Sequence, residues 1–137
     1  MIFNKKKDEN EANLVKIGAL LIHTAKIDEN YSEEEEEIIR KTLLNLGAKQ
    51  KNLDTLITNA KKCENDANQI LDFTKEIKNL NDNDKIKIVK SLWSIIYSNK
   101  NADMYETNLM RRLSGLLYID SKTMGNIKEE IKKENLS

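Results

Sequence analysis

The sequence predicts an all-α protein, a single-domain bundle of about seven helices. Three observations predict this fold class. The 137 residues include no proline and four glycines, so little interrupts a helix. Apolar residues recur at helical spacing, and the aromatic content of 5% provides few positions that favour a sheet. The segment at residues 17–46 also recurs in altered form at residues 88–117, which predicts two pseudo-repeated helix–loop–helix units.

The internal repeat places similar residues at equivalent positions of the two segments. The pairs are Leu21 with Leu92, Asp28 with Asn99, Glu35 with Glu106, Arg40 with Arg111 and Leu46 with Leu117. Each copy is predicted to contain an apolar helix, a short polar loop and a second, amphipathic helix. An acidic or amide residue opens each loop, and a glutamate follows seven positions later.

The first helix is predicted over about residues 11–27. Residues 1–10 are interpreted as a polar N-terminal lead-in, and residues 11–134 as the helical domain. The helix is apolar on more than one face, which is typical of a central helix in a bundle. Its His23 is the only histidine of the chain, so we interpret it as a packed or rim residue and not as a metal ligand.

The second helix is predicted to begin at Ser32, where Ser32-x-x-Glu35 has the spacing of a capping box. Glutamates fill residues 33–37, in the first turns, where the helix dipole favours negative charge. Gly47 is the predicted C-terminal cap.

Five further helices are predicted from apolar residues at core spacing and from capping residues. They are residues 49–63, residues 66–79, residues 83–98, a sixth helix that follows an Asp103-x-x-Glu106 capping box, and a weaker seventh helix capped by Asp120 or Ser121. Trp93, in the fifth of the seven helices, is interpreted as a core anchor.

Composition disfavours several classes of function. Basic and acidic residues balance at 23 each and the basic clusters are scattered, which argues against nucleic-acid binding. The single cysteine, Cys63, excludes an intrachain disulfide and a multi-thiolate zinc site. We find neither a signal peptide nor an apolar run of about 18 residues, so we expect a cytoplasmic protein without membrane insertion. A catalytic triad and a phosphate-binding glycine loop are also missing, so we expect no enzyme.

The paired loops provide the candidate site, although they do not form a conventional EF-hand. An EF-hand loop needs glycine at position 6 and glutamate at position 12. Counted from Asp28, these positions hold Glu33 and Ile39, and the loop counted from Asn99 fails at both positions as well.

A different arrangement is predicted if the two units pack about a pseudo-twofold axis. The four residues that could then converge on a metal ion are Asp28, Glu35, Asn99 and Glu106. Oxygen ligands select Ca²⁺ or Mg²⁺ over softer metals. Because Asn99 carries no charge, we expect weak binding. In the alternative interpretation there is no metal site, since capping explains both glutamates and loop chemistry explains Asp28.

Motifs along most of the chain point to a family. They are Ala25-Lys26-Ile27-Asp28-Glu29 with Glu35, Phe73-Thr74-Lys75-Glu76-Ile77 followed by Leu92-Trp93 and Tyr97, and Asp103-Met104-Tyr105-Glu106 leading into Leu109-Met110-Arg111-Arg112-Leu113. In order and spacing these motifs resemble the tellurite-resistance TerB-like family of bacterial helical domains. The resemblance covers roughly residues 12–130.

The resemblance implies a metal-associated domain of chemical-stress or tellurite-resistance systems. The metal is expected at two acidic corners, which are the loop-to-helix junctions that contain Asp28 with Glu35 and Asn99 with Glu106. The chain departs from the family pattern at Asn99, where the family usually has aspartate. It departs again where Glu29 and Lys100 replace the glycine after each aspartate position.

The leading hypothesis is therefore a non-catalytic TerB-like module that binds a divalent cation at the corners. The alternative is a metal-independent adaptor for an unidentified protein partner.

Overall fold

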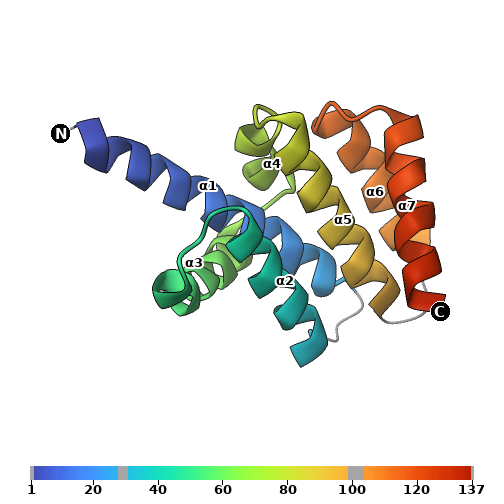
Figure 1. The fold of residues 1–137 in the computed structure, drawn as a ribbon, viewed down its shortest axis with the longest axis horizontal. Coiled ribbons are helices and arrows are strands. Elements are labelled where there is room, and N and C mark those ends of the chain that lie inside the picture. The colour runs from blue at the N-terminus through green and yellow to red at the C-terminus, as the bar shows by residue number, and fades with distance from the viewer. Residues whose placement is uncertain (1, 28–30, 99–103, 137) are drawn as a thin grey trace.

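The computed structural model describes residues 2–27, 31–98 and 104–136, and side chains over residues 11–27, 31–98 and 108–134. Regular structure in these ranges is entirely helical (Figure 1). The elements are α1 (Ile2–Ala25), α2 (Glu33–Asn45), the 3₁₀ turn η1 (Gln50–Asn52), α3 (Leu53–Asp66), α4 (Leu71–Ile77), α5 (Asp82–Ser98), α6 (Met104–Leu116) and α7 (Ser121–Leu136). The predicted all-α class with seven helices is confirmed.

Helix α1 organises the bundle. Its C-terminal half packs against α2, α3, α4 and α5, while its N-terminal half extends past the other helices (Figure 1). Helix α5 packs in turn against α2 and α7. This central position explains why α1 is apolar on more than one face.

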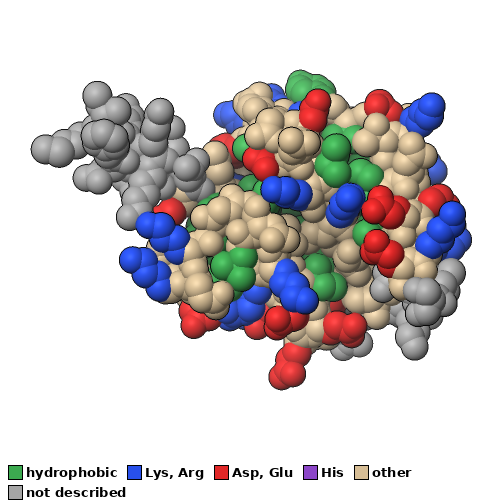
Figure 2. Space-filling view, viewed as in Figure 1, with side chains coloured by type: hydrophobic (Ala, Val, Ile, Leu, Met, Phe, Trp, Pro, Cys, Tyr) green, Lys and Arg blue, Asp and Glu red, His purple; other side chains and the backbone are tan. Residues whose placement is uncertain are grey.

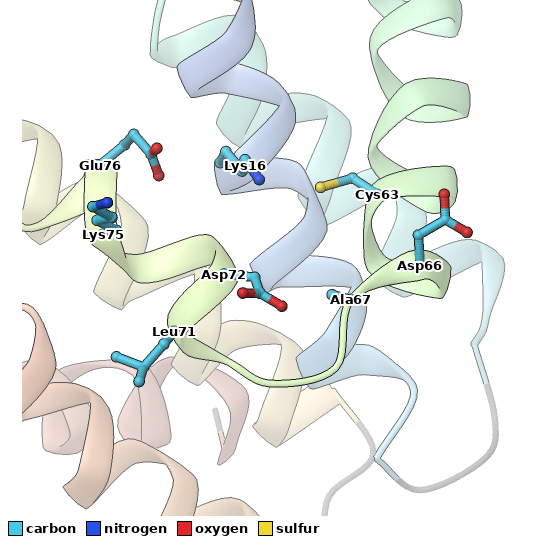
Figure 3. Close-up of a pocket in the computed structure, with 8 residues that line it drawn as sticks. All are labelled: Lys16, Cys63, Asp66, Ala67, Leu71, Asp72, Lys75 and Glu76. Atoms are coloured by element: carbon cyan, nitrogen blue, oxygen red, sulfur yellow. The ribbon is translucent and has the colours of Figure 1, made fainter.

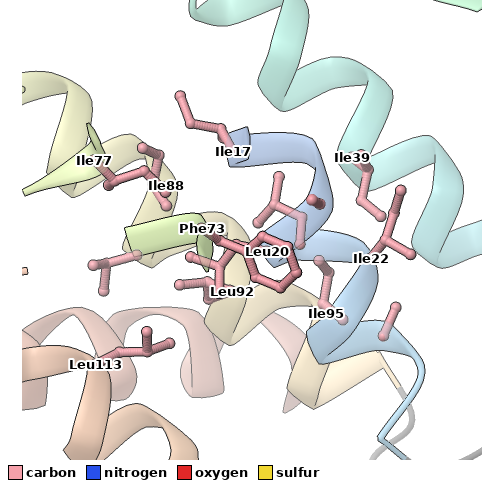
Figure 4. Close-up of a cluster of buried hydrophobic side chains, with 14 of the residues drawn as sticks. Ile17, Leu20, Ile22, Ile39, Phe73, Ile77, Ile88, Leu92, Ile95 and Leu113 are labelled. Atoms are coloured by element: carbon pink, nitrogen blue, oxygen red, sulfur yellow. The ribbon is translucent and has the colours of Figure 1, made fainter. Parts of the chain in front are cut away.

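The core forms where α1, α4 and α5 meet (Figure 4). Leu20 and Leu21 of α1 are fully buried, as is Leu92 of α5. Phe73 from the short helix α4 fills the space between them. Trp93 is 2% exposed, which confirms its prediction as a core anchor.

Helix α1 begins at Ile2 and not near Glu11, so the predicted start was wrong by more than two turns. Residues 2–10 contain neither proline nor glycine. Once a helix exists, each added residue gains a backbone hydrogen bond without a new nucleation step, so the helix continues into this polar segment. The division into a lead-in at residues 1–10 and a domain at residues 11–134 stays a prediction.

Gly47 ends α2 in a left-handed conformation with φ +108°. Its N–H donates to the Leu44 carbonyl at 3.1 Å, and the Ala48 N–H donates to the Leu43 carbonyl at 2.9 Å. These two bonds define a Schellman cap. The predicted capping role of Gly47 is confirmed.

Helix α6 ends in the same way, with a tyrosine in the glycine position. Tyr118 has φ +56°. Its N–H donates to the Gly115 carbonyl at 3.3 Å, and the Ile119 N–H donates to the Ser114 carbonyl at 2.9 Å. The two repeated segments therefore share this C-terminal cap. The pseudo-twofold packing of the complete repeat stays a prediction.

The boundary between α3 and α4 differs from the prediction. Helix α3 continues to Asp66, and α4 begins only at Leu71. Ala67 has an extended backbone with ψ 144°. The Asp72 carboxylate accepts the Asn68 N–H at 3.1 Å. This bond satisfies the Asn68 N–H outside a helix, so residues 67–70 form the connection and the predicted helix at residues 66–79 loses its first turn.

Helices α5 and α7 both start at a capping side chain, and Asp120 is one of the two caps predicted for the seventh helix. The Asn81 side-chain oxygen accepts the Asp84 N–H at 2.8 Å, and the Asp120 carboxylate accepts the Thr123 N–H at 2.8 Å. The bonds from Thr123 lower the pKa of Asp120. Both helix starts are thus satisfied by local side chains.

Candidate functional site

Glu35 lies in the first turn of α2, and the residue is completely buried, at 0% exposure. The Ser32 N–H and hydroxyl each donate to Glu35 Oε1 at 3.0 Å. The Glu35 N–H donates back to the Ser32 hydroxyl at 3.1 Å. The predicted capping box is confirmed.

A buried carboxylate loses its hydration, which is unfavourable unless hydrogen bonds or positive charge compensate. The Ser32 donors provide part of this compensation for Glu35, and the N-terminal end of the helix dipole provides more. Glu35 is thus held in place at the start of α2.

The predicted convergence of four ligands stays a prediction. Asp28 and Asn99 lie outside the described residues, as does the side chain of Glu106. Among the side chains that the structure does describe, no group of three or more His, Cys, Asp or Glu is arranged to hold a metal. Glu35 is therefore the one predicted ligand whose surroundings are described.

Glu36, the residue after Glu35, joins α2 to α3. Lys61 Nζ lies 2.9 Å from Glu36 Oε1, and the Tyr31 hydroxyl donates to the same oxygen at 3.3 Å. Arg40, one turn further along α2, lies 3.8 Å from Glu36 Oε2 and 2.8 Å from Asp54. These five residues form an ionic network beside the candidate corner.

The network shifts the ionisation of its members. The hydrogen bond from Lys61 lowers the pKa of Glu36. Burial raises the pKa of the Tyr31 phenol well above its usual value, and the Glu36 charge adds to this effect. Glu36 is therefore ionised and Tyr31 neutral near neutral pH.

Glu64 on α3 fixes the end of α1. Its carboxylate lies 2.8 Å from Lys26 Nζ and 3.4 Å from His23 Nδ1. His23 is partly exposed and its ring contacts Phe73 at a centroid distance of 6.0 Å. The interpretation of His23 as a rim residue is confirmed, and both ends of the α1–α2 loop are tied to α3.

Sequence reasoning missed these ionic contacts. The spacing of Glu36 and Arg40 along one helix was a visible signal. The partners Lys61 and Glu64 become neighbours only through the packing of α3, so their roles needed the structure.

A cavity of about 500 Å³ opens between α1, α3 and α4 (Figure 3). Lys16, Cys63 and Asp66 line one side, and Asp72 and Lys75 line the other. Its lining carries charges of both signs. This lining favours no single class of ligand and includes none of the predicted site residues.

Seven helices in the described ranges, with the apolar helix α1 at the centre and a buried glutamate at the start of α2, define a small all-helical domain. The family model described as tellurite resistance protein TerB matches residues 14–129. The chain belongs to the TerB family, because the match covers most of its length and both predicted corners. Searches of curated proteins and of solved structures give no match. Within the described ranges, none of the helices is both long and apolar enough to span a membrane.

Proposed function

We propose that this chain is a non-catalytic, cytoplasmic TerB module that binds one divalent cation, Ca²⁺ or Mg²⁺, weakly. Asp28 and Glu35 are the main ligands in this proposal, and Asn99 and Glu106 complete the site from the second corner. The module then acts in a stress or tellurite-resistance system of the kind that its family name indicates.

The observation that carries the proposal is the buried carboxylate of Glu35. Glutamate is rarely buried completely unless it is paired, and the capping box holds the Glu35 carboxylate in place at the start of α2. A cation is a further natural counter-charge for a buried carboxylate at the end of an acidic loop.

The neighbouring lysines support the same proposal. Lys26 is paired with Glu64 at 2.8 Å, and Lys61 is paired with Glu36 at 2.9 Å. Because the ammonium groups beside the corner are already paired with carboxylates, their repulsion of a bound cation is reduced.

The test is a titration with Ca²⁺, Mg²⁺ and Tb³⁺ of the wild type and of Asp28→Ala/Glu35→Ala. We expect saturable binding by the wild type and at least a tenfold weaker affinity, or about 1.4 kcal/mol, in the variant. Glu33→Ala/Glu34→Ala is the matched control, since both side chains are exposed in the same turn. The cation proposal fails if the wild type shows no saturable binding or if the variant binds equally well.

A metal-independent protein adaptor is the second candidate. It is favoured by the exposure of Glu33, Glu34 and Glu37, which present an acidic surface at the start of α2. Affinity purification from the native cell, with and without a chelator, separates the candidates. A stoichiometric partner that is retained in chelator supports the adaptor, and a partner released by chelator supports the cation module.

A further inference from the structure

A groove of about 300 Å³ runs between α2 and α5, which lie side by side (Figure 1). Its lining residues are Ile38, Lys41, Thr42, Asn45, Lys87, Lys90, Ser91 and Ser94. The space-filling view shows lysine and arginine side chains beside hydrophobic ones on this face of the molecule (Figure 2).

The floor of the groove presents mainly carbon atoms. The Thr42 and Ser91 hydroxyls are buried and lie 2.7 Å apart, within hydrogen-bonding distance. The Ser94 hydroxyl donates to the Lys90 carbonyl at 2.8 Å. Since these hydroxyls are satisfied inside the protein, the floor presents mainly methyl and methylene groups together with Ile38, and the exposed Asn45 adds an amide at one end.

The rim of the groove is basic. Lys87 and Lys90 have side chains that are 47% and 44% exposed. Their nearest carboxylates lie at 4.0 Å, on Asp84, and at 3.6 Å, on Glu130. Exposed pairs at such distances contribute little, and Lys87 Nζ also donates to the Asn45 carbonyl at 3.3 Å. The third rim lysine, Lys41, is exposed on α2, and the lining contains no acidic residue.

We propose that this groove binds an acidic amphipathic helix of a partner protein. Two helices that lie side by side leave a groove in which the ridge of a third helix packs. The carbon-rich floor matches an apolar stripe, and the three lysines match the carboxylates that flank such a stripe. Nucleic acid fits less well, because three lysines neutralise few phosphates and the whole chain carries no net positive charge.

The proposal adds a second interaction surface, separate from the acidic start of α2 that favours the adaptor candidate, and uses no residue of the predicted cation site. Its test must therefore be independent of metal. A helical peptide of about 20 residues serves as the probe, with leucine at i, i+3, i+4 and i+7 and glutamate at the flanking positions. The comparison peptide carries lysine in place of each glutamate.

Amide chemical shifts of the ¹⁵N-labelled protein locate the bound peptide. We expect the glutamate peptide to shift the amides of Thr42, Asn45, Ser91 and Ser94, with and without a chelator, and the lysine peptide to shift none of them. Shifts confined to other helices, or equal shifts with both peptides, would overturn the proposal.

Charge reversal on the rim measures the electrostatic contribution. We expect at least about tenfold weaker binding for Lys41→Glu/Lys87→Glu/Lys90→Glu. The control is Lys49→Glu/Lys51→Glu/Lys132→Glu, which makes the same change of net charge at exposed positions outside the groove. Equal effects of the two triple variants would overturn the proposal.

A variant that fills the groove completes the test without a change of charge. Ser94 is half-buried in the lining, and Ser94→Leu is expected to weaken binding about tenfold while circular dichroism shows an intact helical fold. Unchanged binding by this variant contradicts the proposal. If a DNA duplex displaces the peptide and gives the same pattern of shifts, the helix proposal is wrong and the groove binds nucleic acid.

Discussion

Tyr118 occupies, in the cap that ends α6, the position that Gly47 occupies in the cap that ends α2. Both residues have positive φ, +56° for Tyr118 and +108° for Gly47. A side chain is unfavourable in this conformation, whereas glycine adopts it freely. The 73% exposed Tyr118 ring lies 6.0 Å from Lys78 Nζ and 5.8 Å from Lys85 Nζ, contacts that offset part of the strain.

The first prediction separates the backbone strain at Tyr118 from the ring contacts. Tyr118→Ala and Tyr118→Gly both remove the ring, but only glycine relieves the positive φ. We therefore expect Tyr118→Gly to be more stable than Tyr118→Ala by about 1 kcal/mol in urea unfolding. Gly47→Ala should destabilise the protein by a similar amount. A Tyr118→Ala variant as stable as Tyr118→Gly would contradict the left-handed cap.

The second prediction concerns Gly18, where α1 and α3 approach closely. A Cβ atom at this position meets the Ala60 Cβ at 2.9 Å, and both carbons belong to packed helices that cannot move aside easily. We expect Gly18→Ala to reduce the free energy of unfolding by about 1–3 kcal/mol. Adding Ala60→Gly should recover part of this loss, measured as a non-zero coupling in a double-mutant cycle.

Gly125 provides the matched control for Gly18. It lies within α7, and a Cβ at this position meets nothing within 4 Å. Gly125→Ala is expected to stabilise the protein by about 0.5–1 kcal/mol, because alanine favours a helix over glycine. If Gly18→Ala left the stability unchanged or raised it as Gly125→Ala does, the close approach at Gly18 would be contradicted.

The third prediction uses the lowered pKa of Glu36. Lys61 holds this carboxylate in its charged form in the folded protein, so the stabilisation is present above the unfolded-state pKa and is lost as pH falls through the folded-state pKa. We expect Glu36→Gln to lower the free energy of unfolding by about 0.5–1 kcal/mol near pH 7, and this difference to shrink as pH falls below the ordinary glutamate pKa of 4.5.

Denaturant unfolding across this pH range checks the prediction. Glu37→Gln serves as its control because Glu37 is exposed in the same helix. A difference between Glu36→Gln and wild type that persists at low pH would show that the residue acts through packing and not through its charge.

Local signals in the sequence were sufficient for most helix starts and ends. The Ser32–Glu35 box and the Gly47 cap depend on residues a few positions apart, and both are confirmed. The start of α1 was predicted too late because residues 2–10 are mostly polar. These residues contain no glycine or proline, so nothing in them stops the helix. The start of α4 was placed wrongly because α3 continues to Asp66 and Ala67 is extended, and because the Asp72 side chain satisfies the Asn68 N–H outside a helix.

The candidate site was predictable only in part. The position of Glu35 follows from the repeat and from the family pattern, but its complete burial depends on the packing of α2 within the bundle. The Glu36–Lys61 and Lys26–Glu64 pairs join residues far apart in sequence. No local spacing encodes these pairs, since they form only when α3 packs against α1 and α2.

The most direct test of the cation proposal is calorimetric titration of Ca²⁺ into Glu35→Gln and Glu34→Gln beside the wild type. Glutamine at position 35 can keep the capping box but removes the negative charge, and Glu34 is exposed in the same turn. We predict one saturable site in the wild type and in Glu34→Gln, with affinity at least about tenfold weaker in Glu35→Gln. Equal binding by Glu35→Gln and the wild type, or no binding by either, would contradict the assignment of Glu35 as a ligand.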